Sequence, residues 1–255
     1  MSIRKYVIKS YLLLLSAIIF ISIFWGCNMN IADGDWESNK STIHGSGRLV
    51  TIQEDFTDFS QINLSHSFKA NIFKSENYSV VLKMDDNILE HLESFKSNDK
   101  LSLGLEDGYN YNDITLEAEI GVPDITTIDL SGASAVELYG FEFSHSLNIY
   151  LSGASAVKGN ITVGDILMDM SGASYINLAG GGKDLKVYAS GASSVELPDF
   201  SVEKADMKLS GASYSKINVS DYLRIHLSGA SVLYYTGNPT LGEVSVSGVS
   251  KIVRY

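Results

Sequence analysis

A tetrapeptide of small residues, SGAS, recurs through the second half of this 255-residue chain at nearly constant spacing. The copies begin at positions 131, 152, 171, 190, 210, 228 and 247, the last reading SGVS, so the steps between them are 21, 19, 19, 20, 18 and 19 residues. A fixed period near twenty is typical of a solenoid, in which each repeat forms one coil and stacks on the next. We therefore expect residues 129–255 to form a regular solenoid of seven SGAS-type repeats.

The residues before each motif alternate in polarity. The position directly before the motif and the position two residues earlier are apolar in every copy, as in Ile128 and Leu130 of the first and Val244 and Val246 of the last. The position between them is mostly polar or aromatic. This period of two predicts a β-strand with one buried face.

A second short strand is expected after each motif, followed by a return loop such as 178–184 or 235–242. The copy at position 210 is expected to break phase, because Ser215 stands where the others have an apolar residue. The inward column of this second strand reads Val136, Val157, Ile176, Val195, Leu233 and Ile252.

These patterns predict an all-β parallel β-helix with about nineteen residues per coil and SGAS at each corner. Stacked coils lie ~4.8 Å apart, and the strong chirality of parallel crossovers favours a right-handed solenoid. Glycine permits the positive φ of a sharp corner, alanine is small enough to stack, and serine is expected to hydrogen-bond the coils above and below. The structural glycines are Gly132, Gly153, Gly172, Gly191, Gly211, Gly229 and Gly248.

Residues 46–128 show β-type alternation without clean SGAS copies, and we expect irregular coils of the same solenoid that cap its first rung. The segment LSHS at 64–67 is a candidate degenerate corner. Residues 86–95 favour at most a short helix with Asp86 as its N-cap, because their apolar residues share one helical face.

The N-terminus has the features of an export signal, with a basic start, an apolar run from Tyr11 to Trp25, and then Gly26 and Cys27. Gly26-Cys27 resembles a bacterial lipobox, which implies cleavage of residues 1–26 and lipidation of Cys27, the only cysteine, with palmitate among the acyl chains. An uncleaved membrane anchor is the alternative. The polar residues 27–45 are expected to form a flexible tether.

The net charge of the chain limits the kinds of molecule that it is expected to bind. Removing residues 1–26 leaves 16 Lys and Arg against 30 Asp and Glu, a net charge of −14, which disfavours nucleic acid. Membrane attachment would come from the lipid. We expect an exported protein anchored in the cell envelope at the outer membrane, with the periplasmic or surface side undecided.

The chain resembles the bacterial auto-transporter adhesin family with a head GIN domain. The resemblance covers residues 46–255 and rests on RLVTIQEDFTDFSQINLS, DDNILEHLESFKSNDKLSLGL, VPDITTIDLSGAS and the serial SGAS turns. It implies a two-sheet β-helix similar to pectin-lyase folds, an exported location and a role in adhesion. The family supplies no catalytic residues to carry over.

No motif for catalysis, a metal or a cofactor is evident. The five histidines show no metal-ligand spacing, and there is no phosphate-binding glycine loop. We therefore expect a non-catalytic protein without cofactors. Two alternatives stay open, a polysaccharide-acting enzyme of the pectin-lyase-like type and an envelope scaffold that forms homo-oligomers through its solenoid ends.

One outward column is the candidate binding surface, because aromatic rings stack on sugar rings and carboxylates accept hydroxyl protons. A glycan or a cell-surface protein is the expected partner. The alternative is that the tyrosines only stabilise the sheet through cross-strand contacts. The column contains Asp129, Tyr150, Asp169, Tyr188, Lys208 and His226.

Overall fold

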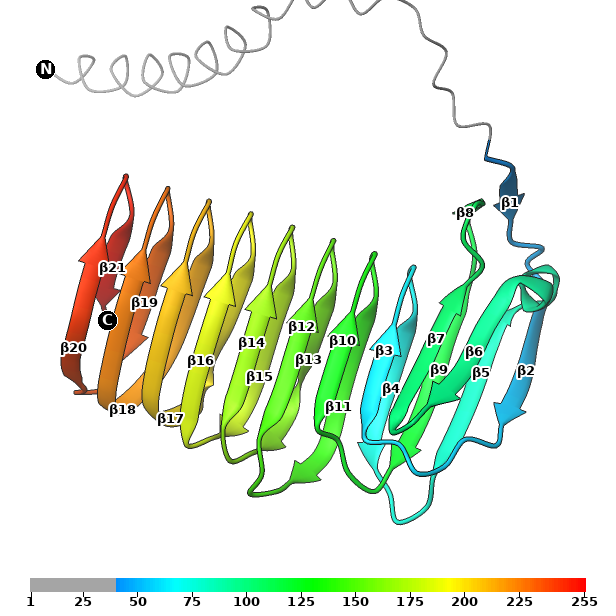
Figure 1. The fold of residues 1–255 in the computed structure, drawn as a ribbon, viewed down its shortest axis with the longest axis horizontal. Coiled ribbons are helices and arrows are strands. Elements are labelled where there is room, and N and C mark those ends of the chain that lie inside the picture. The colour runs from blue at the N-terminus through cyan, green and yellow to red at the C-terminus, as the bar shows by residue number, and fades with distance from the viewer. Residues whose placement is uncertain (1–39) are drawn as a thin grey trace, which may run out of the picture. The chain divides into compact units, whose positions relative to one another are not determined.

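The computed structural model describes residues 40–255, so the predicted signal peptide and Cys27 lie outside the described residues. This part of the chain is an all-β solenoid of stacked parallel coils with one short 3₁₀ helix (Figure 1). The prediction of a parallel β-solenoid is confirmed. Three residues of the expected tether form β1 (Thr42–His44), which pairs in parallel with β8 (Asn110–Asn112).

Each coil has one strand that enters a corner and one that leaves it, and the two kinds of strand form two rows (Figure 1). The entry sheet contains β7 (Lys100–Leu105), β3 (Gln61–Leu64), β10 (Thr127–Leu130), β12 (Leu147–Leu151), β14 (Ile166–Met170), β16 (Asp184–Ala189), the ends of β17 (Ser194–Leu209) and β18 (Tyr214–Leu227), and β20 (Thr240–Val246). The exit sheet contains β9 (Leu116–Val122), β4 (Lys69–Lys74), β11 (Ala135–Glu142), β13 (Ala156–Thr162), β15 (Tyr175–Gly181), the beginnings of β17 and β18, β19 (Val232–Thr236) and β21 (Lys251–Arg254).

The seven SGAS-type corners stack in register. Their glycines have φ between 70° and 74°, and the main chain continues its ladder through the corner, as where the Ala173 amide donates to the Gly153 carbonyl at 2.8 Å. A Cβ atom on Gly172 would overlap that same Gly153 oxygen. Glycine is therefore required for two reasons, the left-handed backbone and the close approach of the neighbouring coil.

The serines of the corners have two different roles. The second serine closes its own corner in five of the seven copies, as where the Ser174 hydroxyl donates to the Ser171 carbonyl at 2.8 Å. The first serine reaches one neighbouring coil through a longer bond, as in Ser190 to the Met170 carbonyl at 3.3 Å. The expectation that the corner serines bond to neighbouring coils was wrong for these five second serines, since their hydroxyls are used within the turn, whereas the Ser250 hydroxyl donates to the Gly229 carbonyl of the next coil.

The core lies between the two sheets and is filled by their inward columns, which are buried in all coils except the last. In that coil Val244 and Val246 are each 45% exposed. The expected phase break at Ser215 was wrong: this residue is buried and pairs in register with Val195 and Leu233. Its small side chain occupies an apolar position without shifting the strand.

Return loops are shorter than expected. β17 and β18 run without interruption for 16 and 14 residues, and each passes from the exit sheet to the entry sheet. Register shifts between Leu197 and Ser201 and between Val202 and Lys204 mark where the paired strands bend. The expected loop 178–184 is also mostly strand, because β15 extends to Gly181 and β16 begins at Asp184.

The N-terminal half departs from the expected run of irregular coils. β3 and β4 form the coil next to β10 and β11, joined at the LSHS corner, where His66 has a φ of 66° and its carbonyl accepts the Ala133 amide. β7 and β9 come later in the chain but stack on the far side of β3 and β4. Antiparallel strands then close this end (Figure 1), and they are β2 (Leu49–Glu54), β5 (Ser79–Asp85) and β6 (Leu92–Ser97).

The expected helix is shorter than its sequence pattern. The 3₁₀ helix η1 (Asp86–His91) has Asp85 as its N-cap residue, not Asp86, and ends before Leu92. Residues 92–97 form β6 and pair antiparallel with β7, so strand pairing overrides the helical periodicity. Phe95 is consequently 53% exposed.

Asp85 joins three segments of this N-terminal cap. Its side chain is 1% exposed, and its two oxygens accept the main-chain amides of Gly47 and Thr115, each at 2.7 Å. These amides belong to the segment before β2 and the segment before β9. The carboxylate therefore satisfies donors that no strand ladder reaches.

Candidate functional site

The outward column predicted from the sequence forms a continuous row on the outer face of the entry sheet. Each of its six members pairs in register with the next across parallel strands, from Asp129 on β10 to His226 on β18. We refer to this row as the outer column. Strand parity points these side chains away from the core, as the sequence pattern predicts.

The tyrosines of the outer column differ in their surroundings. Tyr150 is 38% exposed. The Lys208 ammonium lies 5.1 Å from the centre of the Tyr188 ring, a distance that suits a cation–π contact. At the first member, the Lys100 ammonium lies 3.3 Å from the Asp129 carboxylate. Asp129 and Tyr188 are therefore each engaged by a lysine, whereas Tyr150 is open to solvent.

A cavity of about 350 Å³, which we call the corner cavity, lies where the outer column meets the corners. Four members of the column line it, together with corner serines such as Ser190 and Ser210; Asp129 and Tyr150 do not. The four are Asp169, Tyr188, Lys208 and His226. The structure thus brings these four residues together at one concave site.

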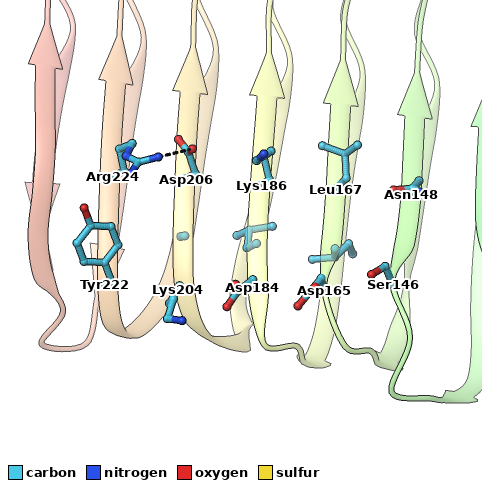
Figure 2. Close-up of a pocket in the computed structure, with 13 residues that line it drawn as sticks. Ser146, Asn148, Asp165, Leu167, Asp184, Lys186, Lys204, Asp206, Tyr222 and Arg224 are labelled. Atoms are coloured by element: carbon cyan, nitrogen blue, oxygen red, sulfur yellow. Dashed lines mark hydrogen bonds and ion pairs between the residues drawn. The ribbon is translucent and has the colours of Figure 1, made fainter.

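A second cavity of about 430 Å³ lies further from the corners on the same sheet, and we call it the cross-strand groove (Figure 2). It crosses five successive entry strands, from β12 to β18, and Figure 2 shows its side chains rising from strands that lie side by side. The lining includes three carboxylates and three cations, and it is completed by Tyr222, Leu167, Ser146, Asn148, Ile166, Leu185 and Ala205. The charged residues are Asp165, Asp184, Asp206, Lys186, Lys204 and Arg224.

The groove contains one ion pair and several unpaired polar atoms. Arg224 Nη1 lies 3.3 Å from Asp206 Oδ2 (Figure 2), and interaction with the Tyr222 hydroxyl, followed by the Asp206 charge, raises the pKa of Arg224 above its ordinary value. Three further buried atoms have no hydrogen-bond partner within residues 40–255, namely Asp184 Oδ1, Asp206 Oδ1 and Arg224 Nε. The groove therefore offers both donors and acceptors.

Sequence reasoning did not select the groove residues as a site. Its outward positions read Asn148, Leu167, Lys186, Asp206 and Arg224, which looks like an ordinary polar sheet surface. The sequence does show acidic and basic residues that alternate along these strands and between neighbouring strands. That alternation becomes meaningful only once the register of the coils is known.

Within residues 40–255, no three His, Cys, Asp or Glu side chains gather in a way that would hold a metal ion. In the same part of the chain no helix has the length and apolar character needed to cross a membrane. The candidate site is a pair of open cavities on a sheet surface, each lined by both charged and apolar groups.

Comparison with protein families identifies the group to which this sheet belongs. The model of the family described as "Putative auto-transporter adhesin, head GIN domain" matches residues 58–239, which include the groove, the whole outer column and all of the corner-cavity lining except Ser245 and Ser247. The chain belongs to this family. The family resemblance drawn from the SGAS turns is thereby confirmed, and the description of the family places the protein among adhesin-like proteins of the cell envelope or surface.

Solved structures share the fold of this head GIN domain protein at low identity. A protein described as "a putative adhesin" from Bacteroides fragilis NCTC 9343 superposes with a TM-score of 0.79 at 18% identity, over 84% of this chain and 100% of that chain. A "putative lipid binding protein" from Parabacteroides distasonis ATCC 8503 gives a TM-score of 0.68 at 14% identity, over 84% and 100% of the two chains. A "putative adhesin" from Parabacteroides merdae ATCC 43184 gives 0.64 at 16% identity, over 84% and 99%. No curated protein matches the chain.

Proposed function

We propose that this protein is a non-catalytic lipoprotein of the cell envelope that binds glycan on the outer face of its entry sheet. The observation that carries the proposal is the in-register outer column beside two cavities. Tyrosine rings, carboxylates and ammonium groups in one row supply the stacking and hydrogen bonding that sugars need. Membership of an adhesin family supports a role in surface contact.

The competing function is that of an enzyme acting on polysaccharide, and the observation in its favour is the pair of groove carboxylates on Asp184 and Asp206. Glycoside hydrolysis requires two carboxyl groups that flank the scissile bond, one to protonate the leaving group and one to attack or activate water. Here Asp206 Oδ2 is already engaged by Arg224 at 3.3 Å, so this carboxylate is not free to serve a scissile bond. Incubation with polysaccharides decides the matter, because a single cleaved substrate would establish the enzyme.

Replacing Tyr150 and Tyr188 together with serine is expected to weaken glycan adhesion about tenfold, since each stacking contact contributes ~0.5–1.5 kcal/mol. Both side chains point outward, so the melting temperature should change little. The two rings are two coils apart, ~10 Å at the strand spacing, and one oligosaccharide can contact both. Binding to a glycan array and thermal melting are measured on the same variant.

Tyr139→Ser is the matched control, because Tyr139 is 47% exposed but lies on β11 of the exit sheet. It should leave adhesion unchanged. If the double variant instead melts earlier and binds as well as the parent, the tyrosines serve the sheet and not the ligand.

The anchor is a separate part of the proposal and rests on Cys27 in the sequence. Cys27→Ser is expected to abolish incorporation of radiolabelled palmitate and to release the protein from the membrane fraction, because the acidic body has little affinity for anionic lipid. Fractionation with label detection provides the measurement. A variant that still sediments with membranes would indicate an uncleaved apolar helix.

A further inference from the structure

We propose that the cross-strand groove binds an uncharged oligosaccharide, whose hydroxyl groups hydrogen-bond Asp184, Asp206 and Arg224. The inference rests on the proposed glycan-binding function and names both a site and a ligand class for it. It assigns the main polar contacts to residues outside the outer column.

The first support is the concentration of unsatisfied atoms in this groove. Within residues 40–255, five buried side-chain oxygen or nitrogen atoms lack a hydrogen-bond partner, and three of them are Asp184 Oδ1, Asp206 Oδ1 and Arg224 Nε. All three residues line the groove. Buried polar groups of native proteins are nearly always paired, and an exception calls for an explanation. A bound ligand with matching donors and acceptors provides one.

The second support is the pattern of charge across the strands. Asp184 faces Lys204, and Lys186 faces Asp206, in the register of β16 and β17. Among the described residues, the only ion pair in the groove nevertheless joins Asp206 to Arg224. The opposite charges are adjacent but do not neutralise one another, so their hydrogen-bonding capacity is available to a ligand.

A hydroxyl group fits this pattern because it donates one proton and accepts through two lone pairs. One sugar hydroxyl can donate to the Asp184 carboxylate while it accepts from the Lys204 ammonium on the facing position. The same holds at Asp206 and Lys186. Hydrogen bonds to charged groups are stronger than those between neutral groups. A ligand with several hydroxyl groups therefore gains binding free energy at several positions along the groove.

Other ligand classes fit less well. An anionic chain would approach three carboxylates in a protein of strongly negative charge, and a cationic chain would approach Lys186, Lys204 and Arg224. An apolar ligand would remove water from the charged groups that line the groove without replacing their hydrogen bonds, which is unfavourable. An uncharged, hydroxyl-rich ligand avoids all three penalties.

The dimensions favour an oligosaccharide over a single sugar. The groove crosses five strands, or four intervals, a length of ~19 Å at the spacing of a parallel sheet. Its ends differ from its middle, with Leu167 towards one end and the Tyr222 ring at the other (Figure 2). These apolar surfaces can contact sugar faces while the central polar groups fix the orientation.

The test measures binding of the full chain to tetrasaccharides by calorimetry. Cellotetraose, maltotetraose and mannotetraose are the uncharged probes, tetragalacturonate is the anionic probe, and the chitosan tetramer is the cationic probe. At least one uncharged probe is expected to bind saturably, and the two charged probes are expected to bind more weakly. Binding confined to a charged probe would overturn the inference.

Asp184→Ala is the decisive variant, and it should raise the Kd for the uncharged probe about ten- to hundredfold, the range for a lost hydrogen bond to a charged group. Because Asp184 Oδ1 is buried without a hydrogen-bond partner within residues 40–255, the melting temperature of the free protein should stay constant or rise. A merely structural aspartate would lower it. Glu203→Ala is the matched control, since Glu203 is an exposed β17 residue that lines neither cavity.

The two levels of the proposal fail in different ways. If an uncharged probe binds equally well to Asp184→Ala but not to the Tyr150/Tyr188 double variant, the groove assignment is wrong and the glycan function stands. If none of the five probes binds, and no glycan on an array binds either, the proposed function fails together with the inference.

Discussion

Replacing Gly172 with alanine is expected to lower the free energy of unfolding by about 2–5 kcal/mol, the sum of a strained left-handed residue and an overpacked contact. Gly172 has a φ of 74°, and a Cβ atom there would overlap the main-chain oxygen of Gly153 in the next coil. The overlap is relieved only if the two corners separate. Separation would weaken the hydrogen bond that the Ala173 amide donates to the same Gly153 oxygen. Chemical denaturation of the parent and the variant gives the difference.

Gly47→Ala separates the two contributions. Gly47 has a φ of 75°, nearly that of Gly172, but no heavy atom would lie within 4 Å of a Cβ atom there. The free energy of unfolding of Gly47→Ala should fall by only ~1–2 kcal/mol, the cost of the left-handed conformation for a residue with a Cβ atom. Equal losses in the two variants would show that coil contact at the corner contributes nothing and that backbone conformation alone explains the repeated glycine.

Replacing Asp85 with alanine is expected to cost about 2–5 kcal/mol, because the main-chain amides of Gly47 and Thr115 lose the charged acceptor that they share. The loss should appear first at the N-terminal cap. Hydrogen exchange of β2 and β5 is the local measurement, and denaturant unfolding is the global one.

Two variants of this pair of aspartates test the cause. Asp85→Asn keeps one carbonyl oxygen as an acceptor and should fall between the parent and Asp85→Ala. Asp86→Ala removes the neighbouring carboxylate, which bonds the Ser46 hydroxyl at the surface, and should have a much smaller effect. If Asp86→Ala is as damaging as Asp85→Ala, the net charge near η1 determines stability there and the two Asp85 hydrogen bonds do not.

The coils could be predicted because each signal is local and repeated. Ile128 and Leu130, for example, alternate with polar neighbours. In every copy a glycine follows the first serine of the motif, as it follows Ser131, and this glycine marks the corner. The N-terminal cap could not be predicted in the same way. The position of β7 and β9 beyond β3 and β4 depends on pairing between strands that are distant in sequence. No local sequence pattern indicates which of these strands pair.

The candidate site shows the same division. The outer column follows from strand parity and repeat length, so all six members were expected in one row. The groove was not foreseen, because Asp184 and Lys204 belong to different coils and reveal their relation only through the register of β16 and β17. Burial of the Asp184 oxygen without a partner is likewise a property of packing.

The superposed corners have an evolutionary consequence. Excision of residues 171–189, a segment of 19 residues, would join Met170 to Ser190 and regenerate an intact apolar residue followed by SGAS. Since each coil contacts only its neighbours, such an event shortens the molecule by one strand spacing and leaves equivalent surfaces in contact. Unequal recombination between the repeats can therefore change the length of the solenoid by whole coils, without any point substitution in its core.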